Sequence, residues 1–62
     1  MKRNWIRRLR DTGEEIPITA NEAHVRLQGY YLDVPLAMSG ATKDAPATTG
    51  HSDYYPVTTL NK

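Results

Sequence analysis

Residues 39–53 contain no Val, Leu, Ile, Met, Phe, Tyr or Trp, and small or polar residues dominate them. A segment of this composition buries too little apolar surface to offset the conformational entropy lost on folding. The whole chain has 62 residues and no Cys, so neither a disulfide nor a thiolate zinc site can compensate. The sequence therefore predicts that this part of the chain is ordered only by contact with a partner.

Residues 4–19 have the pattern of two short strands joined by a turn at residues 11–14. Gly13 can adopt the positive φ that a tight turn needs. The register that best pairs apolar with apolar and plus with minus sets Leu9 opposite Ile16, Arg10 opposite Glu15 and Arg7 opposite Ile18. Because Pro17 cannot donate a ladder hydrogen bond, we expect either that the second strand lies at an edge of the sheet or that its proline faces away from the pairing.

A helix is predicted next, since Thr19 and Glu22 have the spacing of a capping box. It runs to about residue 28, where Gly29 can end it in the left-handed conformation. Residues 30–34 then alternate as a strand that Pro35 stops. The predicted core consists of Trp5, Leu9, Ile16, Ile18, Ala23, Leu27, Tyr30, Leu32 and Val34.

These elements predict an α+β fold with a ββαβ docking module over residues 1–35. Residues 36–62 are expected to form an extended, irregular tail with a terminal anchor at residues 54–60. Tyrosine and tryptophan are enriched where proteins meet, because their rings are apolar and their tips are polar. The candidate partner-binding residues are Trp5, Tyr31, Tyr54, Tyr55, Val57 and Leu60.

The net charge is only +1, but five of the eight basic residues fall in the first ten positions. This segment could neutralise phosphates and stack Trp5 on a base. The candidate nucleic-acid contacts are Lys2, Arg3, Arg7 and Arg8. The alternative is that alternating arginines form the solvent face of a strand and protect its edge from aggregation.

The sequence offers little for catalysis, and we expect neither an enzyme, nor a cofactor, nor a small-molecule substrate. His24 reads as a helix-surface residue and His51 as a loop residue. His51 and Asp53 could supply two metal ligands, but no further ligands lie nearby in sequence. No apolar run is long enough to span a membrane, and no signal peptide is recognisable, so the protein is expected to be soluble and intracellular, or at least made inside the cell.

The stretches WIRRLRDTGEEIPIT and ANEAHVRLQGYYLDV, an arginine-containing hairpin followed by a capped, glycine-terminated helix, resemble small proteins of tailed-bacteriophage particles. The resemblance implies a head-associated, decoration or connector role in many copies, with incorporation in a virion. We therefore expect a structural subunit that binds neighbouring protein chains. The alternatives are a nucleic-acid-binding accessory protein and a small inhibitor of a host enzyme.

Overall fold

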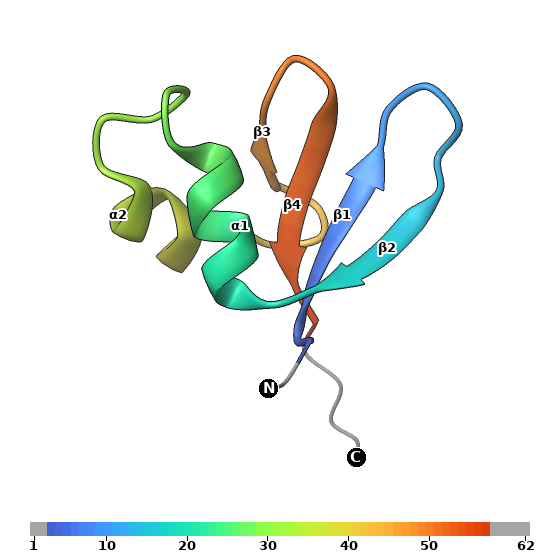
Figure 1. Cartoon of the computed structure of the whole chain (residues 1–62), viewed down its shortest axis with the longest axis horizontal. Helices are drawn as coiled ribbons and strands as arrows, with labels where there is room; N and C mark the ends of the chain where they lie inside the picture. The colour runs from blue at the N-terminus through green and yellow to red at the C-terminus, as the bar shows by residue number, and fades with distance from the viewer. Residues whose placement is uncertain (1–2, 58–62) are drawn as a thin grey trace.

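Four short strands form one antiparallel sheet, and both helices lie on the same side of it (Figure 1). The computed structural model describes residues 3–57. The strands are β1 (Trp5–Leu9), β2 (Glu15–Ile18), β3 (Ala47–Thr48) and β4 (Ser52–Pro56), in the spatial order β2-β1-β4-β3. The helices are α1 (Ala20–Leu27) and α2 (Val34–Ser39). The predicted α+β class is confirmed, with the element order ββααββ in place of ββαβ.

The first hairpin forms where it was predicted, but its register differs. Arg7 lies opposite Ile16, whereas Ile18 was expected there, so the pairing is displaced by two residues. Because side chains alternate with a period of two, the displacement leaves every residue on its predicted face. Its cause is a wider turn, in which the amide of Leu9 donates to the carbonyl of Glu14 (2.9 Å) and Gly13 has a φ of 77°. The edge position of β2, predicted from Pro17, is confirmed.

Helix α1 begins as the capping signal predicted. The hydroxyl of Thr19 accepts a hydrogen bond from the amide of Glu22 at 3.0 Å, which satisfies a backbone donor that the first turn leaves free. At the other end, Gly29 has a φ of 91°, a conformation in which other residues are strained. Ala23 and Leu27 on the inner side of the helix are fully buried against the sheet.

The strand predicted over residues 30–34 is wrong. Asp33 instead caps α2, and its side chain accepts from the amide of Leu36 at 3.2 Å. Pro35 lies in the first turn of this helix, where its missing N–H costs nothing. An Asp followed two residues later by Pro was therefore the start of a helix and not the end of a strand. Tyr30 and Leu32, both assigned to the core, are exposed.

The extended tail predicted from residue 36 is wrong for the described residues 36–57. This segment completes α2, forms β3 and returns as β4, which pairs with β1 along its whole length from Trp5 opposite Pro56 to Leu9 opposite Ser52. The last strand of the chain is thus an interior strand of the sheet. It is ordered by contacts within the chain, so the two-part division at residue 35 does not describe this fold.

The two faces of the sheet have different coverings. The helix-covered face packs apolar side chains against α1 and α2, and its buried cluster consists of Trp5, Ile18, Ala23, Leu27, Val34, Ala41, Ala47 and Tyr54. The opposite face carries Arg8, Asp53 and Tyr55, which occupy the alternate positions of β1 and β4. We call this second surface the open face.

Both edges of the sheet are protected against pairing with another strand. Pro17 lies in the edge strand β2. At the other edge, the hydroxyl of Tyr31 donates to the carbonyl of Thr48 (3.0 Å) and accepts from the amide of Thr48 (2.8 Å). A single side chain therefore satisfies both backbone groups of the last residue of β3. Edges treated in this way do not readily add a strand from a second protein.

Candidate interaction groove

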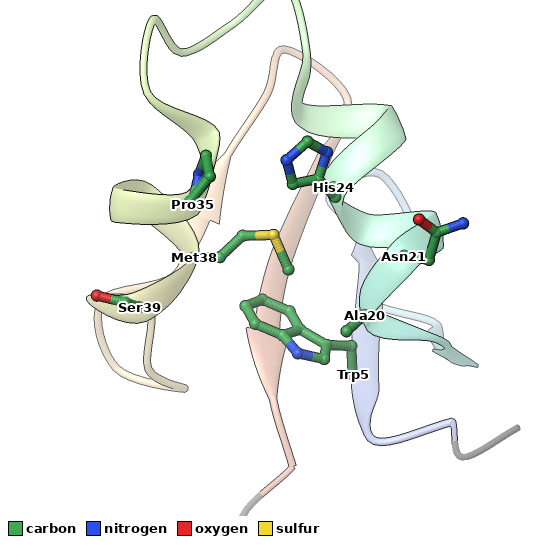
Figure 2. Close-up of a pocket in the computed structure, with 7 residues that line it drawn as sticks. All are labelled: Trp5, Ala20, Asn21, His24, Pro35, Met38 and Ser39. Atoms are coloured by element: carbon green, nitrogen blue, oxygen red, sulfur yellow. The ribbon is translucent and has the colours of Figure 1, made fainter.

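An apolar groove of about 470 Å³ lies between α1 and α2 (Figure 2). Its floor is the ring of Trp5 from β1, and the side chain of Met38 from α2 lies over that ring in Figure 2. The groove is lined by Trp5, Ala20, Asn21, His24, Pro35, Met38 and Ser39. We refer to it as the interhelix groove.

One small residue of α1 helps to leave this groove open. Ala20 occupies the first position of the helix and lines the groove, so the helix wall there ends at a methyl group. Met38 closes one side with an unbranched, polarizable side chain that can adapt to different shapes. The result is an open hollow in which apolar atoms are accessible from outside.

Polar groups stand at the rim of this hollow. Asn21 and His24 project from α1, and Ser39 lies near the end of α2 (Figure 2). No Asp, Glu, Lys or Arg is among the lining residues that the structure describes. An apolar floor with a few uncharged hydrogen-bonding groups at its edge is typical of a site for an uncharged apolar group.

Trp5 contributes a polar atom as well as a surface. Only 7 % of the residue is exposed, yet its indole nitrogen lies on the side of the ring away from His24 (Figure 2). Within residues 3–57 no acceptor bonds this N–H. The nitrogen is also not one of the enclosed polar atoms, so it can be reached from outside. An indole N–H near an apolar surface normally finds an acceptor. A bound group could supply that acceptor here.

Three of the predicted partner-binding residues contact other parts of the same chain, and two of them are buried. Tyr54 belongs to the core cluster, with 3 % of its surface exposed. Tyr55 is 4 % exposed on the open face, where its hydroxyl donates to the carboxylate of Glu15 at 2.7 Å. Tyr31 seals the edge of β3. Tyr54 and Tyr55 are therefore too buried to contact a partner, whereas the prediction for Tyr31, which is partly buried, stays a prediction.

The other three predicted partner-binding residues, Trp5, Val57 and Leu60, have different positions. Trp5 is buried on its sheet side but lines the interhelix groove, so it is the one predicted residue that the described structure leaves within reach of a partner at this site. Val57 is partly buried at the end of β4 and lines a shallow hollow on the open face. Leu60 lies outside the described residues.

The predicted basic segment is divided between the two faces of the sheet. Arg8 lies on the open face, where it pairs with Asp53 at 3.1 Å and stacks 5.3 Å from the centre of the Tyr55 ring. Arg7 lies on the helix-covered face and donates to the hydroxyl of Ser52 at 3.2 Å. Arg3 is exposed, and Lys2 lies outside the described residues. Arg7 and Arg8 therefore do not belong to one continuous surface.

Several groove residues were not predicted from the sequence. Met38 and Pro35 were assigned to the tail or to the end of a strand, so their proximity to α1 could not be anticipated. The one available signal was the Asp33-Val34-Pro35 order, which indicates a helix start. With that helix in place, the approach of α2 to α1 follows from the short connection between them.

Two further site classes find no support in the described part of the chain. Over residues 3–57, neither helix is long and apolar enough to cross a bilayer. In the same range, no three or more His, Asp or Glu side chains gather closely enough to hold a metal ion.

Comparison with family models, curated proteins and solved structures finds no match to this chain.

Proposed function

We infer that this chain is a non-enzymatic binding subunit that holds a neighbouring protein through the interhelix groove. The observation that carries this inference is the apolar hollow floored by Trp5 and Met38, open to the outside and rimmed by uncharged polar groups. Interfaces of proteins concentrate their binding energy in such central aromatic and methionine-lined depressions.

The occupant that fits is an uncharged peptide segment with one large apolar side chain. The apolar side chain would fill the space between Ala20 and Met38, while a backbone carbonyl accepts from the indole N–H of Trp5. An anionic lipid or a nucleic acid is a poorer fit, because no cationic residue is among the described lining residues. Strand addition is also disfavoured, since Pro17 and Tyr31 protect the two edges of the sheet.

The size of the groove favours weak binding at each copy. A hollow of about 470 Å³ accepts one or two side chains, far less than the interface area of a stable complex. Weak contacts of this kind hold an assembly together when many copies act at once. A multi-copy structural role, as in the virion setting that the sequence resemblance suggests, is consistent with this requirement. An inhibitor of a single enzyme needs a larger or tighter surface.

Selection from a peptide library tests the proposal. Uncharged peptides displayed on phage are selected on the wild-type chain and counter-selected on Ala20→Glu, which places a charge in the groove. A glutamate in the first turn of a helix is favourable, so this variant should fold. The control is Val25→Glu, which adds the same charge to α1 at a residue that is 57 % exposed and does not line the groove.

We expect enrichment of peptides that share one large apolar residue. A selected peptide should bind wild type and Val25→Glu equally and bind Ala20→Glu about tenfold more weakly, the effect of losing one well-packed anchor. Equal binding of the peptide to all three proteins, or no enrichment at all, would contradict the proposed function.

A further inference from the structure

A second, polar pocket lies on the helix-covered side near the end of α1. It has a volume of about 170 Å³ and collects side chains from β1, α1, β4 and the turn that joins β3 to β4. The lining residues are Arg7, Arg26, Tyr30, Thr49, His51, Ser52 and Tyr54. None of them lines the interhelix groove. We call this second site the arginine pocket.

The arginine pocket has an excess of positive charge. Two arginines line it, and no carboxylate is among its described lining residues. Within residues 3–57, Arg7 forms no ion pair, although it is partly buried. A partly buried guanidinium that has no carboxylate partner can pair with a negatively charged group from outside the chain.

A hydrogen bond to Ser52 fixes the orientation of the Arg7 guanidinium. Its Nε donates to the hydroxyl of Ser52 at 3.2 Å, which fixes one edge of the fork and leaves the terminal nitrogens for a ligand. Ser52 is 1 % exposed and is itself held by the side chain of Thr49, which accepts from the Ser52 amide at 3.0 Å. Ser52 is thus a positioning residue for Arg7.

The second cation of the pocket, Arg26, is more exposed to solvent than Arg7. It pairs with Glu22 one turn earlier at 3.2 Å, but more than two-fifths of each side chain is exposed. Such a surface pair contributes little free energy and is readily exchanged for a better anion. The two arginines come from a strand and a helix, so they can approach one group from different directions.

The size and the rim of the pocket indicate what it holds. A pocket of about 170 Å³ is smaller than the sites that enclose whole small molecules, and it suits a single anionic group. Tyr30 lines it while 53 % of the residue is exposed, so an aromatic surface lies beside the cations. Cations next to an exposed aromatic ring are the two components by which proteins hold single-stranded nucleic acids.

We propose that the arginine pocket binds one backbone phosphate of a single-stranded nucleic acid, with Arg7 and Arg26 contacting the phosphate and Tyr30 stacking on an adjacent base. This contact differs from the predicted one, which used Lys2, Arg3, Arg7 and Arg8 as a continuous segment. It keeps Arg7 and replaces the others by residues brought close in space. It is also independent of the interhelix groove and of the proposed protein partner.

The test is fluorescence anisotropy of a labelled short oligothymidylate with the full chain, over a series of salt concentrations. Arg7→Gln should weaken binding about tenfold, as expected for a lost charge-assisted contact. It should also reduce the slope of log affinity against log salt by about 0.7, the value for one phosphate of a single strand. Tyr30→Leu should weaken binding several-fold and leave that slope unchanged.

Two further variants keep the test informative if Arg7→Gln folds poorly. Glu22→Gln frees Arg26 and should tighten binding two- to threefold, by about the strength of a surface ion pair. Lys43→Gln is the matched control, since Lys43 is an exposed cation that lines the hollow beside Tyr55 on the open face, and its affinity should stay within twofold of wild type. Circular dichroism checks the fold of each variant.

Several outcomes would overturn the proposal. If Lys43→Gln weakens binding as much as Arg7→Gln does, the oligonucleotide is attracted by overall charge and not by the pocket. If a phosphorylated peptide binds more tightly than the oligothymidylate and is lost with Arg7→Gln, the phosphate belongs to a protein ligand. The Ala20→Glu variant should bind its peptide weakly and still bind the oligonucleotide as wild type does, so the two proposals can fail independently.

Discussion

Tyr54 and Tyr55 are neighbours in β4, and they are buried to nearly the same extent by opposite means. Tyr54 points to the helix-covered face and packs among apolar side chains in the core. Tyr55 points to the open face, where the hydroxyl reaches Glu15 and the guanidinium of Arg8 lies over the ring. One face of this sheet is closed by apolar packing and the other by hydrogen bonds and ion pairs. The lesson is that a small chain with few large apolar residues can cover both faces when polar groups are mutually satisfied.

Among the described residues, the open face contains one enclosed polar atom that has no hydrogen-bond partner. Asp53 accepts from Arg8 through Oδ2 at 3.1 Å, whereas its Oδ1 is enclosed and has no hydrogen-bond partner among the described residues. The guanidinium of Arg10 also lies near that oxygen, with its Nε 3.8 Å away. Arg10 therefore contributes attraction without a hydrogen bond, and the open face should respond more strongly to salt than the helix-covered face.

Breaking the apolar side should have the largest effect. Leu27 is fully buried on α1, and Leu27→Ala removes its contacts and leaves a cavity, which costs about 2–5 kcal/mol. A chain of this length has a free energy of unfolding of about 3–9 kcal/mol, so much of the stability is lost. Urea denaturation followed by circular dichroism measures the change.

The control for this substitution is Leu36→Ala on α2, where 68 % of the residue is exposed. Its effect should stay within about 0.5 kcal/mol, as for most surface positions. A small loss for Leu27→Ala would mean that the helix-covered face does not dominate the stability, and the contrast between the two faces would disappear.

Breaking the polar side should have an intermediate effect. Tyr55→Phe keeps the ring and deletes the hydroxyl that donates to Glu15, and we expect a loss of about 1–2 kcal/mol because the acceptor is a charged group. A double-mutant cycle with Glu15→Gln isolates the pairwise contribution. Additive single effects would show that this hydrogen bond does not stabilise the open face.

The smallest effect is a pH dependence confined to alkaline conditions. Burial, and then the hydrogen bond to Glu15, raise the pKa of the Tyr55 phenol above its ordinary value of 10.0. The folded state therefore favours the protonated phenol, and this contribution is complete below pH 10.0 and declines as the pH rises through the folded pKa.

Comparison of wild type with Tyr55→Phe isolates that phenol from the other tyrosines. The wild type should lose stability relative to Tyr55→Phe as the pH rises above about 10, in urea titrations at several alkaline pH values. Parallel curves for the two proteins over that range would argue against a perturbed Tyr55.

The parts of the fold that could be predicted are those with local signals. Thr19 and Glu22 lie three residues apart and defined the start of α1, and Gly13 marked a turn that the structure contains. Hairpin registers depend on turn width as well as on pairing, so a wider loop displaced the ladder by two residues. The faces of the first hairpin were predicted correctly because they depend only on alternation.

The pairing of β4 with β1 could not be predicted in the same way. Arg8 and Asp53 are 45 residues apart, and no local pattern in either segment indicates the other. The composition argument failed because it counted apolar area and neglected close packing of small residues. Ala41 and Ala47 are buried in the core, and Ser52 is enclosed because its polar atoms are hydrogen-bonded.

The interhelix groove was unpredictable for a related reason. It requires α2, and α2 was read as the end of a strand because Pro35 can end one element or begin another. Trp5 was identified as a contact residue on the ground that few other large side chains were available. That reasoning selected a residue that lines the groove, without any knowledge of the helices that surround it.

Trp5 is the only tryptophan in the sequence, and its ring forms the floor of the interhelix groove. Near-ultraviolet excitation selective for indole therefore reports from a single place in the molecule. A guest that displaces water from that ring should shift the emission to shorter wavelength. The protein thus carries an intrinsic, label-free optical probe at the position where occupancy most needs to be observed.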